Sequence, residues 1–507
     1  MTTPAPPPGS PAGSTSDSSS RPVRTGASTP TAPGGERSSA IETRSLDWVP
    51  TAERHGKVWL QGPFWFLGNF QPFTVAIGLI GPAVGLSLGW TATAGIAGIL
   101  FGTFFMAFHA TQGARLGLPQ MIQSRAQFGY SGVLVPLIGS LVTFVAFNIV
   151  DTVIIGEGLQ GIFGWNPVLV GVVISLIATV LAIYGHDWLH TTFKVLFWIS
   201  LPFWVILTIG VLTGAAGGSP AAADGGYNTT GFIIMFTAAA SYNITYAPYV
   251  SDYSRYLPED TAPVKIIASV FWGAAASPAW LIPLGAWFAT SLGVSDALVG
   301  IHDAGNAVFP SLGSILAVLA VLALVATMGL NAYSGMLSLI TAIDAVRPVP
   351  RTRGVRIAGI LVLAVVWTVV GVGLSDASEA LNTALLVMLY LLAPWTAVNL
   401  VDYFFVRRGH YAIADLFTPD GIYGRWGIRG LIAYAVGILA EIPFISVAGF
   451  YSGPTAEALG GVDLAVVVGL AVPGVLYLLL TRRLDVATER SAIAHSDELL
   501  ADVDPAQ

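Results

Sequence analysis

Long runs of apolar residues recur along the chain and are separated by short polar stretches. The runs lack the period-two alternation of polar and apolar residues that is typical of membrane strands. At about 1.5 Å per helical residue, each run is long enough to cross roughly 30 Å of hydrocarbon. The pattern predicts an all-α membrane protein with twelve transmembrane helices, over residues 62–86, 91–110, 132–160, 167–184, 192–213, 230–250, 264–290, 313–340, 356–374, 380–402, 429–450 and 463–481.

The composition agrees with a protein that is mostly surrounded by lipid. Hydrophobic residues make up 54% of the 507 positions, and charged residues make up only 10%. A soluble domain carries roughly 25% charged residues, because its surface faces water. The composition therefore argues against a soluble enzyme and against a nucleic-acid-binding protein. Since the chain has no cysteine, disulfides, thiolate nucleophiles and cysteine-bound metals are excluded as well.

Both ends of the chain are polar. Residues 1–40 contain eight Pro and nine Ser but only one large aliphatic residue, Val23. We expect a disordered tail over residues 1–45, because this composition cannot bury enough apolar area to order the chain. No apolar segment follows a basic start, so a signal peptide is not expected. The twelve-helix domain is then residues 46–481, and residues 482–507 form a cytoplasmic C-terminal tail.

The distribution of charge predicts the orientation in the membrane. With twelve spans, all 22 Lys and Arg lie in the tails, in the loops on the same side as the tails, or in adjoining first turns. The loops on the opposite side carry only acidic charges, namely Asp224, Asp296, Asp303, Asp376, Glu379, Glu457 and Asp463. The positive-inside rule places the basic side in the cytoplasm. We therefore expect a multi-pass protein of the plasma membrane with both termini in the cytoplasm.

Two of the predicted spans are interrupted by proline beside polar residues. Residues 68–72 read G-N-F-Q-P in the first span, and residues 241–248 read S-Y-N-I-T-Y-A-P in the sixth. One such site is often only a kink, but two sites five spans apart indicate an inverted repeat with a ligand site near the midplane. The repeats would cover residues about 60–213 and 230–402, with two extra helices over 429–481.

Several motifs resemble the nucleobase–cation symporter-1 family, which includes purine, cytosine, allantoin and hydantoin transporters. Residues 113–119 (G-A-R-L-G-L-P) and 124–129 (S-R-A-Q-F-G) are similar to the family's first cytoplasmic loop. Residues 251–258 (S-D-Y-S-R-Y-L-P) resemble its entry to the seventh span, and residues 329–334 (G-L-N-A-Y-S) its asparagine motif. The resemblance implies a five-plus-five core of the leucine-transporter type with two appended C-terminal helices.

The resemblance also implies a substrate site. Phe147 stands where relatives have an aromatic that stacks on the base, and Asp151 stands where they have an amide that bonds it. Tyr246 matches a second stacking aromatic, and Asn331 matches the family's binding asparagine. Each residue also has an ordinary structural interpretation: helix packing for the two rings, and a bond to a neighbouring helix for Asp151.

Gln71 and Thr74, in the interrupted first span, are weaker candidates for substrate binding. A polar stripe along the eighth span is typical of helix–helix contacts. No Lys or Arg lies within a span beyond its first turn, so a neutral, flat substrate fits better than an anion. We expect no cofactor and no resident metal.

The leading functional hypothesis is cation-coupled import of a nucleobase such as cytosine or a purine, with H⁺ as the coupling ion. Na⁺-coupled transport of hydantoin, allantoin or another flat heterocycle is the alternative; a channel or a membrane enzyme is a more distant one. By resemblance, sodium-coupled relatives carry hydroxyl side chains in the eighth span where this chain has Val325 and Ala326, with Thr327 displaced by one residue. Asp151 supplies a titratable group, because burial favours the protonated form of a carboxylic acid.

Overall fold

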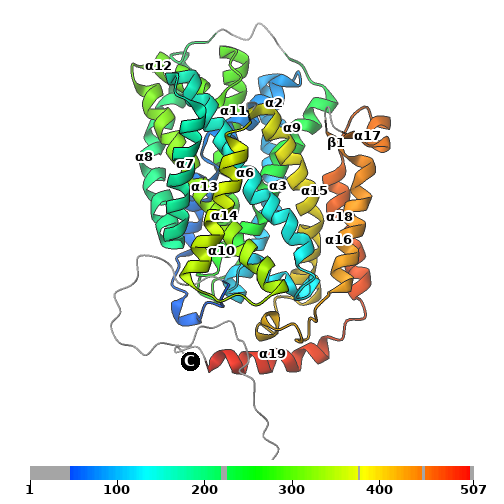
Figure 1. Ribbon diagram of the computed structural model, residues 1–507. Coiled ribbons are helices and arrows are strands. Elements are labelled where there is room, and N and C mark those ends of the chain that lie inside the picture. The colour runs from blue at the N-terminus through cyan, green and yellow to red at the C-terminus, as the bar shows by residue number, and fades with distance from the viewer. Residues whose placement is uncertain (1–45, 219–224, 375–376, 448–450, 503–507) are drawn as a thin grey trace, which may run out of the picture.

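The computed structural model describes residues 46–218, 225–374, 377–447 and 451–502. The tail expected over residues 1–45 lies outside the described residues. The described chain is a bundle of helices, and a helix lies across one end of it (Figure 1). Its short strands β1 (Ser446–Val447) and β2 (Tyr451–Ser452) pair with each other antiparallel.

Each of the twelve predicted segments overlaps a helix or a pair of helices. The main helices are α1 (Gln61–Asn69), α2 (Pro72–Ala83), α3 (Leu88–Leu116), α6 (Leu134–Phe163), α7 (Pro167–Tyr184), α8 (His186–Thr213), α9 (Thr229–Ile244), α10 (Ala247–Ser254), α11 (Pro263–Trp287), α13 (Leu312–Val346), α14 (Arg353–Gly371), α15 (Ala377–Val401), α16 (Ile428–Glu441) and α18 (Ala465–Thr481). The segment predicted over 429–450 is too long, because α16 ends at Glu441, β1 follows, and residues 448–450 lie outside the described residues. Within the described residues, eight helices are long and apolar enough to span a membrane, and the bent pair α1–α2 makes a ninth.

Shorter α-helices occupy connections between the main ones: α4 (Gln120–Gln123), α5 (Arg125–Phe128), α12 (Ala297–Val308) and α17 (Pro454–Ala458). Helix α19 (Val486–Ala501) follows α18. The sequence pattern did not predict α12, because its 12 residues form a loop helix too short to span a membrane. The Asp296 side chain caps it by accepting a hydrogen bond from the Val299 backbone N–H at 2.9 Å.

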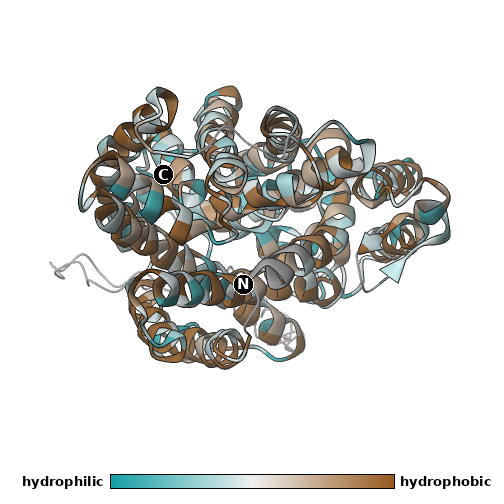
Figure 2. Cartoon of the chain, turned by 90° about the horizontal axis from the view of Figure 1, so that it is seen from above, coloured by the Kyte–Doolittle hydropathy of each residue, from teal (hydrophilic) through white to brown (hydrophobic). Residues whose placement is uncertain are grey.

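Small residues let the central helices approach closely. A Cβ atom at Gly98 of α3 would lie 2.3 Å from the Phe236 carbonyl oxygen of α9, and one at Gly102 would lie 2.2 Å from that of Ala240. These two glycines are one helical turn apart, which is the spacing of close helix pairs in membranes. Around the rim of the bundle the ribbon is largely hydrophobic (Figure 2). Exposed large side chains such as Leu176, Leu212 and Val365 therefore suit contact with lipid.

Both predicted interruptions are present, and proline explains each. Helix α1 ends at Asn69, and α2 begins at Pro72 after a bend of 55°. Proline has no N–H and favours an extended residue before it, and Gln71 has φ −158° and ψ 169°. In the second interruption, α9 ends at Ile244 and α10 begins at Ala247 after two intervening residues, with Pro248 in its first turn.

The C-terminal segment is more ordered than a plain polar tail. Helix α19 lies across one end of the bundle (Figure 1). Arg407 donates from Nε and Nη2 to the two carboxylate oxygens of Glu489 on α19, at 3.0 and 2.9 Å. Leu500 near the end of α19 is buried, and the Ser496 hydroxyl accepts from the Ala414 backbone N–H at 3.0 Å. The polar sequence does not predict this helix, because most of its contacts with the bundle are made by single polar groups.

We predict that Glu489→Ala detaches α19 from the bundle. Removing one partner of a buried, bidentate ion pair leaves Arg407 with Asp402 alone and costs about 1–3 kcal/mol. The matched control is Glu498→Ala, because the side chain of Glu498 is 82% exposed on the same helix. Limited proteolysis should cleave within residues 486–502 faster in Glu489→Ala than in Glu498→Ala. Equal cleavage rates would contradict this role for the ion pair.

Candidate functional site

Side chains join the two interrupted helices directly to each other. Asn69, the last residue of α1, donates from Nδ2 to Asn243 Oδ1 of α9 at 2.8 Å and to the Ala274 carbonyl of α11 at 2.8 Å. Asn243 donates in turn to the same carbonyl at 3.1 Å and to the Thr103 hydroxyl of α3 at 2.6 Å. The ends of α1 and α9 are therefore fixed against each other and against α3 and α11.

The start of α2 is bonded to α9 through one tyrosine. Gln71 Oε1 accepts from the Phe73 backbone N–H at 2.6 Å and so caps α2, while Gln71 Nε2 donates to the Tyr242 hydroxyl at 2.8 Å. The Thr74 hydroxyl lies 2.5 Å from the Asn69 carbonyl oxygen and 3.0 Å from the Tyr242 hydroxyl. Gln71 and Thr74, both candidates from the sequence, are thus engaged within the protein.

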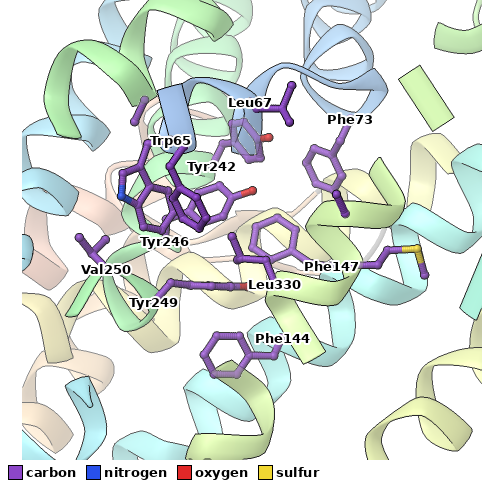
Figure 3. Close-up of a cluster of buried hydrophobic side chains, with 14 of the residues drawn as sticks. Trp65, Leu67, Phe73, Phe144, Phe147, Tyr242, Tyr246, Tyr249, Val250 and Leu330 are labelled. Atoms are coloured by element: carbon purple, nitrogen blue, oxygen red, sulfur yellow. The ribbon is translucent and has the colours of Figure 1, made fainter. Parts of the chain in front are cut away.

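Aromatic side chains from α1, α2, α6 and the α9–α10 junction gather beside these bonds (Figure 3). We call this group the aromatic cluster; it consists of Trp65, Phe73, Phe144, Phe147, Tyr242, Tyr246 and Tyr249. All seven side chains are buried. The cluster brings together Phe147 and Tyr246, which lie 99 positions apart in the sequence.

Phe147 and Tyr246 face each other without a gap wide enough for a third ring. Their centroids are 5.7 Å apart, and their planes meet at 19°. A flat ring between two aromatic faces requires about 7 Å, which is twice the ~3.5 Å contact distance of carbon atoms. The Tyr246 hydroxyl also donates to the Gly68 carbonyl of α1 at 3.2 Å. A ligand can enter between these rings only if the two side chains move apart.

Asp151 lies one helical turn beyond Phe147 on α6 and is 1% exposed. It shares a face of α6 with Phe147, which belongs to the aromatic cluster. Its Oδ2 atom has no hydrogen-bond partner in the described part of the chain. A charged carboxylate at this depth without a partner would be costly.

Asn331 on α13 is buried and meets α6 through a second asparagine. Its Nδ2 atom donates to Asn148 Oδ1 at 2.8 Å, and Asn148 Nδ2 donates to the Met328 carbonyl oxygen at 3.1 Å. Asn331 Oδ1 is buried and has no hydrogen-bond partner among the described residues. Like Asp151, Asn331 therefore offers an oxygen that can accept a hydrogen bond from a ligand.

The polar stripe along α13 bonds mainly to its own helix at the two threonines. The Thr327 hydroxyl donates to the Ala323 carbonyl at 3.1 Å, and the Thr341 hydroxyl donates to the Leu337 carbonyl at 2.7 Å. These bonds run four residues back along the helix, as is common for threonine in apolar surroundings. Thr327 and Thr341 therefore bond within α13, whereas Asn331 between them bonds across to α6.

The sequence interpretation did not select Asn69, Tyr242, Asn243 or Asn148 as important for the site. The first three lie in the interrupted segments themselves, where a polar side chain beside a proline was the available signal. Asn148 shares the helix face of Phe147 and Asp151, which was also visible. What the sequence did not reveal is which of these groups pair with each other.

Comparison with known proteins agrees with the motifs. A family model for permeases of cytosine and purines, uracil, thiamine and allantoin matches residues 48–469. YxlA of Bacillus subtilis, a candidate purine-cytosine permease by name, is 36% identical over 450 residues, which cover 87% of this chain and 96% of the relative. The purine-cytosine permease fcyB of Emericella nidulans is 25% identical over 476 residues, which cover 87% and 88%.

Solved structures show that the fold is shared. Mhp1, a nucleobase-cation-symport-1 family transporter in a closed conformation with bromovinylhydantoin bound, has a TM-score of 0.73 at 19% identity. That alignment covers 91% of this chain and 100% of Mhp1. A Na⁺-coupled sialic acid symporter has a TM-score of 0.52 at 13% identity, covering 85% and 91%. From the extent of the family match and the YxlA identity, we conclude that the chain belongs to the nucleobase–cation symporter-1 family of permeases and is a transporter, not an enzyme.

Proposed function

We propose that the protein imports a nucleobase such as cytosine or a purine across the plasma membrane, in symport with a proton. The observation that carries the proposal is the aromatic cluster, in which two flat side chains, Phe147 and Tyr246, lie near buried oxygens that have no partner. Aromatic faces bind flat heterocycles, and the free oxygens of Asp151 and Asn331 can accept from ring N–H groups. The names of the relatives YxlA and fcyB support the same class of substrate.

In this proposal the chain crosses the membrane twelve times. Residues about 60–213 and 230–402 are two inverted repeats of five spans, and residues 429–481 supply two more. The two interrupted helices, at corresponding positions of the repeats, support this arrangement. Both termini lie in the cytoplasm, as the distribution of Lys and Arg suggests, and substrate reaches the midplane site from each side in turn.

The choice of a proton over a sodium ion rests on the available ligands. Na⁺ needs several oxygen atoms to replace its hydration shell, but Val325 and Ala326 offer no side-chain oxygen, and the Thr327 hydroxyl donates within α13. Asp151 can instead carry a proton into the protein and release it on the other side. The alternative is Na⁺-coupled transport of a hydantoin, allantoin or related heterocycle, which the bound ligand of Mhp1 supports.

The most direct test of transport is radiolabelled uptake in a host that lacks its own nucleobase transporters. We expect saturable uptake of cytosine or a purine, and competition by a panel of nucleobases should rank the substrates. Strong competition by hydantoin or allantoin, with none by cytosine or purines, would favour the alternative. Conversion of the substrate by the purified protein would contradict transport as the whole activity.

We predict that Asn331→Ala lowers the affinity for substrate roughly ten- to a hundredfold, because a buried hydrogen bond is lost at about 1–3 kcal/mol. Thr341→Val on the same helix is the matched control, since its hydroxyl bonds only to α13. Competition binding to membranes with equal amounts of protein measures the effect. Unchanged affinity in Asn331→Ala would exclude Asn331 from the site.

We predict that Phe147→Ala and Tyr246→Ala each weaken binding about three- to tenfold or more, because each aromatic contact contributes about 0.5–1.5 kcal/mol beyond area burial. Phe147→Tyr and Tyr246→Trp should retain binding, because both keep an aromatic face. Phe101→Ala, which alters an aromatic contact with Phe236 outside the cluster, serves as the control. Normal affinity in both alanine variants would show that these rings only pack the core.

We predict that uptake in sodium-free buffer is faster at an external pH of about 5.5 than at about 7.5, because a protonated Asp151 is the state that loads substrate. Asp151→Asn should abolish concentrative uptake and flatten the pH response, whereas Glu157→Gln, nearer the end of the same helix, should retain both. Uptake that strictly requires sodium, or concentrative uptake by Asp151→Asn with the normal pH response, would contradict the proton assignment.

A further inference from the structure

The contact between α6 and α13 fixes which atom of Asn331 is available to a ligand. The Met328 carbonyl oxygen can only accept a hydrogen bond, so the group of Asn148 that faces it at 3.1 Å must be the NH₂ donor. The other end of the Asn148 amide, its Oδ1 atom, therefore faces Asn331. Rotating this amide by 180° would bring two oxygens together beside Met328.

The orientation of the Asn148 amide also determines the orientation of the Asn331 amide. Because Asn148 presents an oxygen, Asn331 must present its NH₂ group to that oxygen, and the two atoms are 2.8 Å apart. The Asn331 Oδ1 atom is left free: it is buried and has no partner within the described ranges. The direction of both amides thus follows from a backbone carbonyl and does not depend on a choice between equivalent orientations.

The polar side chains at the start of α2 offer no free hydrogen-bond donor to a ligand. Gln71 Nε2 is committed to the Tyr242 hydroxyl at 2.8 Å, and the Thr74 hydroxyl lies against the Asn69 carbonyl oxygen. Among the described residues, the buried side-chain atoms of α6 and α13 without a partner are Asp151 Oδ2, Asn331 Oδ1 and Ser334 Oγ. Of these, Asn331 Oδ1 can only accept a hydrogen bond. A ligand edge that carries only hydrogen-bond acceptors would place an acceptor against Asn331 Oδ1, which is also an acceptor.

We propose that Asn148 is a positioning residue that holds Asn331 as an obligatory hydrogen-bond acceptor, so that the site selects heterocycles that present a ring or amino N–H to Asn331 Oδ1. This inference rests on the proposed function, because it assumes that the ligand is a heterocycle bound beside Asn331. It goes further in assigning a donor requirement to the substrate and a role to Asn148. Selectivity then comes from a residue that does not touch the ligand.

The test uses the best substrate from the nucleobase panel and its analogues in which each ring N–H is replaced in turn by oxygen or each NH₂ by a methoxy group. Each change turns a donor into an acceptor and adds no hydrogen to a neighbouring ring nitrogen. At least one analogue should bind the wild-type protein at least about tenfold more weakly, since an unsatisfied acceptor is left at Asn331. If every analogue competes within about threefold of the parent, the donor requirement is wrong.

Two variants separate positioning by Asn148 from a merely structural role. In Asn148→Leu, Asn331 is free to turn its NH₂ group to the ligand, so the penalty for the same analogue should shrink to about threefold or less. Asn148→Asp keeps an oxygen that accepts from Asn331 and should retain the full penalty. A full penalty in a well-expressed Asn148→Leu, or its loss in Asn148→Asp, would overturn the positioning role.

The result also separates this inference from the function on which it rests. Uptake of a heterocycle by a protein that binds all the analogues equally would overturn only the donor requirement. No uptake and no binding of any heterocycle would overturn the proposed function and this inference together. If Asn148→Leu does not reach the membrane, the wild-type analogue series and Asn148→Asp still decide the outcome.

Discussion

The bonds between the two interrupted helices are the constraint on which the rest of the structure depends. A helix that stops inside a membrane exposes carbonyl and N–H groups, and each one left without a partner costs several kcal/mol. Here the freed groups are satisfied by neighbouring side chains: the Tyr246 hydroxyl donates to the Gly68 carbonyl, and Thr74 lies against the Asn69 carbonyl. The side chains that stabilise the interruptions are therefore also neighbours of the site.

This double use of the same residues couples the site to the conformation of the bundle. Tyr246 stacks on Phe147 and at the same time bonds α1, so separating the two rings for a ligand changes the contact between the interrupted helices. In contrast, Asn148 and Asn331 form a bond between α6 and α13 that leaves an acceptor free without any movement. In the candidate site, the two rings must separate before a ligand can bind between them, whereas the Asn331 oxygen is already available as an acceptor.

The sequence predicted the helices and the positions of the breaks because both depend on local chemistry. Apolar runs of sufficient length become helices in lipid. Proline beside polar residues predicts the two breaks, whereas Pro202 of α8 and Pro278 of α11 lie inside continuous helices. The pairing of Asn69 with Asn243 was not predictable, because it joins residues 174 positions apart and depends on how the helices cross. The same limit applies to Gln71 and Thr74, whose polar groups looked free in the sequence but are used by Tyr242 and the backbone.

Helix α19 shows a different limit. Its sequence is polar, and nothing in its pattern indicates that Glu489 meets Arg407, 82 positions earlier. Besides the ion pair, the partly buried Ile493 and the buried Leu500 pack on the bundle, and two such residues leave only a weak apolar signal. In the bundle itself, the burial of Asp151 can be expected from its place in an apolar run. The sequence does not predict whether its carboxylate oxygens have hydrogen-bond partners.

The central claim is that a flat heterocycle binds between Phe147 and Tyr246 with an N–H directed at Asn331. A cryo-electron microscopy structure of the protein with its best substrate bound tests this claim most directly. The account predicts that the two ring centroids, now 5.7 Å apart, separate to about 7 Å with the ligand between them, and that a ligand nitrogen lies about 3 Å from Asn331 Oδ1. A ligand bound elsewhere, with Phe147 and Tyr246 still in contact, would contradict it.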